Sequence, residues 1–269
     1  MRSNKALQPT SLPPGLRPYG KAAAELGRQP HRNCMRPQDI EFKDQRALAL
    51  IVDIALLLEE SKLSEARWLG RSCARASITS SALLLECAAN SCLFSLALPA
   101  KLQDELDKLP AISKLDYYLF SKTGKHIDRG CRETELAADT IKLRDHVVHP
   151  KPKTGKLVDG TETSYVDYGT IKGLGIPFDV LEWDHIAAHK VGTAVVGFLK
   201  KYFMEWCALS KNRVTTLLVV RETAMIQGDT QSWAVMPEVE HAAVQKWIPS
   251  LLEFLDLRPN DGAPSIEQA

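Results

Sequence analysis

Apolar residues recur along most of the chain at the three- and four-residue spacing of helices that bury one face. The spacing predicts helices over residues 39–61, 64–98, 101–108, 113–120, 133–148, 183–207 and 237–257. The second of these is either one long helix or two segments broken near Gly70, and it is expected to stop at Pro99, because proline cannot continue a helix. The pattern therefore predicts an all-α fold.

Two stretches do not follow this spacing. Residues 152–182 are rich in Gly, Thr and Asp and are predicted to form the longest irregular connection, and a loop of that length beside a candidate site is often functional. Residues 213–226 contain the run Val214 to Val220, whose β-branched residues favour a strand, while its length and surroundings also allow a helix. Pro249 is expected to bend the last helix.

Composition divides the chain into three parts. Residues 1–36 are polar and proline-rich, so this segment is expected to be disordered. Residues 37–207 hold the predicted helical domain, and residues 208–269 form a helical C-terminal extension whose structure the pattern leaves uncertain. Because 45% of the 269 residues are hydrophobic, the chain can bury a substantial core.

The charge balance and the cysteines narrow the class of protein. The formal net charge is +1, which excludes a strongly basic nucleic-acid footprint but allows a small local patch. The six cysteines form no CxxC pair, which is typical of reduced thiols and favours a cytoplasmic protein. The apolar stretch 47–58 is too short to span a membrane, and 81–98 carries Glu86 and Asn90, so buried helices explain both better.

The segment Leu143 to Lys151, with the sequence LRDHVVHPK, is the one stretch that indicates chemistry. Arg144 and His149 stand five apart, and an arginine that stays charged can grip a phosphate while an imidazole moves a proton near neutral pH. On a regular helix the two side chains would point about 140° apart. Pro150 should end the helix, however, and leave His149 in an unwound last turn from which it can approach Arg144.

This segment resembles a known family. Residues 141–149, read as Ile-Lys-Leu-Arg-Asp-His-Val-Val-His, resemble the Rx4–6H signature of the HEPN superfamily, the helical domains of many RNases and toxins. Residues 76–90 are similar to the long central helix of those domains, which often carries a glutamate and an asparagine in an apolar context. The resemblance covers roughly residues 39–206 and implies an antiparallel helical bundle.

The resemblance also implies an activity. Active members of the family use the arginine and histidine across a homodimer to cleave RNA, with no metal or other cofactor, and typically leave a cyclic phosphate end. It implies that Arg144 stabilises the charge of the phosphorane, that His149 acts as general acid or base, and that Asp145 orients one of them. A toxin or defence role with an antitoxin or other protein partner follows from the same resemblance. The lysines near the motif either bind RNA or belong to a solvated loop, and they are Lys142, Lys151, Lys153 and Lys156.

A structural role for the same residues is the alternative. Glu86 and Asn90 stand four apart on an otherwise apolar helix, and their burial would require partners. Arg144 would then point inward, pair with Glu86 and fasten two core helices. In that case the protein is a non-catalytic partner-binding or structural module of the same fold.

Other candidate sites are weaker. His185 and His189 suit two metal ligands by spacing, but Ile186 stands where zinc proteases have a glutamate and only Asp184 is a further candidate, so no metal site is expected. His146 is closer to Arg144 than the family spacing allows and is expected to face solvent or a dimer partner.

The N-terminal segment carries a second resemblance. Residues 4–30 resemble the peptide obtained when an integron recombination repeat is translated by read-through. This resemblance implies that synthesis starts at Met35 rather than Met1 and that the gene is a mobile cassette.

Overall fold

The computed structural model of the chain describes residues 46–152, 154–158, 164–219, 222–226 and 229–260. All of them belong to one compact unit that spans residues 43–269. The expectations for residues 1–36, disorder and a start at Met35, lie outside the described residues, as does the beginning of the first predicted helix.

The described chain is mostly helical, which confirms the all-α class at this coarse level. The α-helices are α1 (Ala47–Leu63), α2 (Arg67–Phe94), α3 (Ala100–Leu106), α4 (Ala111–Thr123), α5 (Arg132–Val148), α6 (His185–Lys200), α7 (Lys211–Leu218), α8 (Glu238–Trp247) and α9 (Leu251–Phe254). A 3-10 turn, η1 (Val180–Glu182), precedes α6, and a π-helical segment, η2 (Lys201–Trp206), continues it.

Apart from the strand considered for residues 213–226, no strands were predicted from the hydrophobic pattern. The hairpin of β1 (Lys156–Val158) and β2 (Tyr165–Asp167) and the hairpin of β3 (Thr170–Ile171) and β4 (Ile176–Pro177) lie in the stretch expected to be irregular. A third sheet joins β5 (Glu222–Ile226) antiparallel to β6 (Asp229–Met236), and β6 parallel to β7 (Leu257–Pro259). The prediction of a single irregular connection over 152–182 was therefore wrong, because two paired hairpins and η1 organise it.

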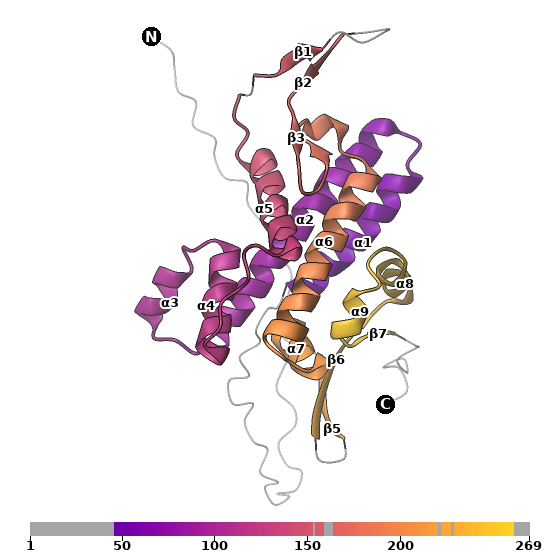
Figure 1. The fold of residues 1–269 in the computed structure, drawn as a ribbon. Helices are drawn as coiled ribbons and strands as arrows, with labels where there is room; N and C mark the ends of the chain where they lie inside the picture. Colours follow the sequence, from indigo (N-terminus) through magenta and orange to yellow (C-terminus); the bar gives the residue numbers. More distant parts are fainter. Residues whose placement is uncertain (1–45, 153, 159–163, 220–221, 227–228, 261–269) are drawn as a thin grey trace, which may run out of the picture. The chain divides into compact units, whose positions relative to one another are not determined.

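Helix α2 is the central element of the core. It packs against α1, α4, α5 and α6, and the three residues between α1 and α2 make these two helices an antiparallel hairpin (Figure 1). The interior is filled by fully buried side chains such as Ile54, Leu85 and Phe198. Helix α2 runs unbroken through the buried Gly70, where an added Cβ would lie 3.0 Å from the Ser61 carbonyl oxygen, so glycine permits a close approach to α1.

By length and composition α2 would also pass as a membrane span, which is weak evidence because the core helix of a soluble protein passes the same test. Of its most apolar 18-residue window, 56% is buried inside the fold. Packing on four neighbouring helices accounts for its apolar composition without a bilayer.

Residues 208–260 pack on the helices that precede them. Helix α8 lies against α1, and α9 lies against α6 and α7. For the run Val214 to Val220 both a strand and a helix were left open. The helix holds up to Leu218, where α7 ends, and the described strand β5 begins at Glu222. Near Pro249 the last predicted helix is interrupted rather than bent, and it gives the separate α8 and α9.

Candidate functional site

Helix α5 carries the motif and ends where its sequence predicts. Glu133 and Glu135 lie in its first turn, where their charges suit the positive end of the helix dipole. Its last helical residue is Val148, and His149 has left the helical conformation, with φ −123° and ψ 64°. The His149 amide still donates to the Asp145 carbonyl at 2.9 Å. The prediction that Pro150 stops the helix and leaves His149 at its end is confirmed.

Arg144 is held by two carboxylates. Its Nη1 donates to Glu86 Oε1 on α2, and its Nε and Nη2 donate to Asp145 Oδ1 at 3.0 and 2.8 Å. Burial alone would lower the pKa of Arg144, but the hydrogen bonds and charges of Asp145 and Glu86 outweigh it and raise the pKa above its ordinary value. The guanidinium is therefore charged and held in one orientation.

The pair between Arg144 and Glu86 lies near the surface, not in the core. The exposed fraction of the side chain is 19% for Arg144, 36% for Glu86 and 48% for Asp145. The structural alternative expected the contact between Arg144 and Glu86, but it expected a buried carboxylate that needs compensation. Because Glu86 reaches water, such a pair contributes only about 0–1 kcal/mol to the free energy of unfolding.

Asn90 does not share this contact. It lies one turn further along α2, is exposed, and its Oδ1 accepts a hydrogen bond of 2.7 Å from the buried Lys114 of α4. Asp107 lies 3.9 Å from the same ammonium. The structure thus pairs Asn90 with Lys114, not with Arg144, the partner predicted for it.

The remaining predicted residues surround the end of α5. The side chains of His149 and Lys151 are exposed, and Lys156 is exposed in β1. Lys142 donates to Asp139 one turn earlier on α5 at 2.8 Å, so part of its charge is neutralised. Lys153 lies outside the described residues. The structure therefore joins Arg144 to Asp145 and Glu86, and it leaves the imidazole of His149 at the solvent-exposed helix end.

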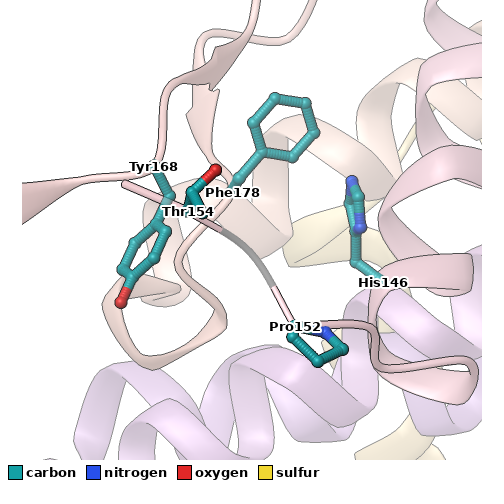
Figure 2. A pocket seen from close by; sticks show the side chains of 5 residues that line it. All are labelled: His146, Pro152, Thr154, Tyr168 and Phe178. Carbon is teal, nitrogen blue, oxygen red and sulfur yellow. The ribbon is translucent and has the colours of Figure 1, made fainter. Parts of the chain in front are cut away.

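An open hollow of about 310 Å³ adjoins the end of α5, and no motif in the sequence indicated it (Figure 2). His146 of α5 lines one side, with its ring edge-on to that of Phe178 at a centroid distance of 4.7 Å and an interplanar angle of 86°. Pro152, Thr154 and Tyr168 complete the lining. His146 thus contacts Phe178, where the sequence analysis expected it to face solvent or a partner. The aromatic residues within a Gly- and Thr-rich stretch are the signal that would have drawn attention to it.

Two glycines fit the hairpins around this hollow. A Cβ on Gly155 would lie 2.2 Å from Val166 Cγ1 and 3.1 Å from Tyr168 Cδ1, so glycine permits this close approach of the two sides of the first hairpin. Gly169 has φ +82°, and its carbonyl accepts the Phe178 amide at 2.9 Å. These positions hold Tyr168 and Phe178 at the hollow.

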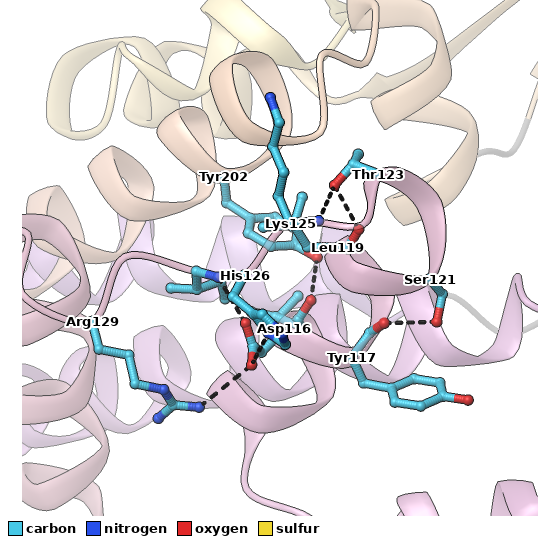
Figure 3. Close-up of polar contacts among 11 residues, drawn as sticks. Asp116, Tyr117, Leu119, Ser121, Thr123, Lys125, His126, Arg129 and Tyr202 are labelled. Carbon is cyan, nitrogen blue, oxygen red and sulfur yellow. Dashed lines mark hydrogen bonds and ion pairs between the residues drawn. The ribbon is translucent and has the colours of Figure 1, made fainter.

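Two other polar groups have structural roles. Asp116 accepts the Ile127 amide at 2.7 Å and lies 3.1 Å from His126 Nδ1 and 3.9 Å from Arg129 Nη2 (Figure 3). These contacts hold the loop between α4 and α5 against α4. Asp184 caps α6 by accepting the Ala187 amide at 2.9 Å.

His189, a candidate metal ligand by its spacing from His185, lies edge-on to the Trp247 ring at a centroid distance of 5.7 Å. Within the described part of the chain, no group of three His, Cys, Asp or Glu side chains suits a metal ion.

No protein-family model, curated protein or solved structure matches the chain. The resemblance to the HEPN superfamily and the integron resemblance therefore remain predictions from the residues quoted for them. A function has to be argued from the chemistry of the site itself.

Proposed function

We propose that this protein is a HEPN-like endoribonuclease that cleaves single-stranded RNA without a metal ion and acts in the cytoplasm as a homodimer. The observation that carries the proposal is the state of Arg144. Its guanidinium is charged, oriented by Asp145 and Glu86, and still partly exposed, one turn before the exposed His149. A preorganised cation on the helix that ends at an exposed imidazole, a group able to transfer protons, suits phosphodiester chemistry.

A phosphate can compete for this arginine at low cost. Glu86 binds it through one guanidinium nitrogen and is 36% exposed, so the carboxylate can turn to water with a loss of about 0–1 kcal/mol. Asp145 holds the other edge through two nitrogens and keeps the orientation. Asp145 is thus a positioning residue for Arg144 rather than for His149.

The reaction needs only the RNA, water and these side chains. The 2′-oxygen of a ribose attacks the adjacent phosphorus, its bond to phosphorus forms, and the bond from phosphorus to the 5′-oxygen breaks. One proton leaves the 2′-hydroxyl and one is delivered to the departing 5′-oxygen; His149 serves one of these transfers and water serves the other. Arg144 stabilises the negative charge that develops on the phosphorane oxygens. The products carry a 2′,3′-cyclic phosphate and a 5′-hydroxyl.

The test is cleavage of end-labelled, mixed-sequence single-stranded RNA by the purified chain in the presence of a chelator. We expect cyclic phosphate ends, and a loss of rate of at least about 100-fold in both Arg144→Ala and His149→Ala. Arg132→Ala, at the exposed start of α5, and His241→Ala on α8 are the matched controls and should cleave like the wild type. Cleavage that survives both motif substitutions would refute the assignment.

A second function is favoured by one observation, the double neutralisation of Arg144 by Glu86 and Asp145. An arginine with two carboxylate partners suits an ion pair between α2 and α5. The protein would then be a non-catalytic module that binds a partner or organises an assembly. Absence of cleavage by the wild type, together with a large loss of stability in Glu86→Gln, would favour this function.

A further inference from the structure

The hollow beside α5 has no role in the bond-breaking step described above. We propose that it binds one unstacked base of single-stranded RNA at the end of α5, beside His149, and this inference rests on the proposed function. Its position supports this: His146 lies on the last turn of α5, three residues before His149, and positions three apart share one side of a helix. A nucleotide that contacts His149 has a base within reach of the hollow.

The lining has the chemistry of a base site. Proteins that recognise single-stranded RNA stack splayed bases on Phe, Tyr and His rings and bind the base edges through polar groups. The rings of His146 and Phe178 are nearly perpendicular, at 86°. A base that stacks on one ring therefore turns its own edge toward the face of the other. Thr154 adds a hydroxyl group at the rim, and Tyr168 lies next to it (Figure 2).

The charge around the hollow suits an RNA strand more than an apolar peptide. Lys151, directly before Pro152, and Lys156, in β1, are both exposed and flank the lining in sequence. Their ammonium groups can neutralise the phosphates on either side of a bound base. A paired base is held inside the duplex, so the site selects unpaired nucleotides.

The test separates base binding from cleavage. The probe is a fluorescent, mixed-sequence 2′-O-methyl oligonucleotide, which resists cleavage because its attacking hydroxyl is blocked, and a second probe has the same length without bases. Affinities are measured by fluorescence anisotropy for the wild type, Phe178→Leu and Tyr168→Leu. Phe120→Leu, an aromatic on α4 that is 50% exposed, is the matched control. Thermal denaturation checks that each variant is folded.

We expect Phe178→Leu and Tyr168→Leu each to weaken binding of the base-containing probe about tenfold, because a stacked base loses its ring. Phe120→Leu should bind like the wild type, and the probe without bases should bind all four proteins equally. Equal binding of the base-containing probe by all four proteins, or no binding at all, overturns the base site and leaves the hollow to a protein side chain. Base-dependent binding without cleavage of natural RNA sustains the hollow and refutes only the proposed activity.

Discussion

The contribution of Glu86 to stability distinguishes a phosphate-binding Arg144 from one that fastens two helices. Its side chain is 36% exposed, and Arg144 retains two hydrogen bonds to Asp145 when Glu86 is neutral. We expect Glu86→Gln to lower the free energy of unfolding by less than about 1 kcal/mol, because exposed ion pairs contribute little. Urea denaturation measures it. Leu85 next to it is fully buried, and we expect Leu85→Ala to lower the free energy of unfolding by about 2–5 kcal/mol. A loss above about 2 kcal/mol in Glu86→Gln would instead identify a structural fastener.

Gly169 provides a second test, at the hairpins that hold the hollow. Its φ of +82° is strained for any residue with a Cβ, so we expect Gly169→Ala to reduce stability by about 1 kcal/mol. Gly197 is the matched control, since it lies in α6 and an added Cβ there meets no atom within 4 Å. In Gly197→Ala the better helix former should raise stability by up to about 1 kcal/mol. Shifts of the same sign in the two urea curves would contradict this account.

At the residue scale, part of the site could be predicted. The end of α5 followed from Pro150, because the restriction that proline places on the residue before it is local. The surface position of Glu86 could not be predicted, since α2 is apolar on most sides and its pattern does not show which side meets other helices. Asn90 was placed wrongly for the same reason, and the hollow depends on hairpins that bring Tyr168 and Phe178 to His146.

At the element scale, α1 and α8 are joined by one carboxylate. Glu59 accepts two hydrogen bonds of 2.7 Å from Lys246 Nζ and a third from the Trp247 indole. These bonds, with Lys246 the larger cause, lower the pKa of Glu59 below its ordinary value of 4.5. We expect Glu59→Gln to reduce stability by about 1 kcal/mol at pH 7, because the ammonium of Lys246 is half exposed.

The pH dependence of this contribution has a definite sign. A carboxylate with a lowered pKa in the folded state stabilises the fold above its unfolded pKa and loses this effect as the pH falls through the folded value. The difference in stability between wild type and Glu59→Gln should therefore be constant from pH 7 to about 5 and shrink below 4.5. Glu60→Gln, exposed on the same helix, is the control. A difference that grows toward acid pH would contradict the role of the charged form.

The long helices were predictable because their apolar spacing repeats over several turns, whereas the strands were not. β3 and β4 have two residues each, which is too short for an alternating pattern to be read. In the run Val214 to Val220, the β-branched composition was misleading. Ser210 caps α7 by accepting the Arg213 amide, and Val214 and Leu218 are buried one turn apart, so helical packing outweighs strand propensity.

At the scale of the whole molecule, helices α7, α8 and α9 are part of the core rather than an appendage. Phe254 of α9 is fully buried in a cluster that also contains Val191 and Leu199 of α6 and Val214 of α7. Lys211 of α7 donates to the Leu252 carbonyl at 2.7 Å, which ties α7 to α9. The helical domain predicted to end at 207 is thus completed by the segment that follows it.

Because that packing is shared, a change in the C-terminal segment should destabilise the helices that hold the motif. We expect Phe254→Ala to lower the free energy of unfolding by about 3–5 kcal/mol, and amide hydrogen exchange to accelerate in α6 and α2 as well as in α9. Val239→Ala on α8, where the side chain is 73% exposed, should change stability by less than about 0.5 kcal/mol. Acceleration confined to residues after 207 would show instead that the extension unfolds independently of α2 and α6.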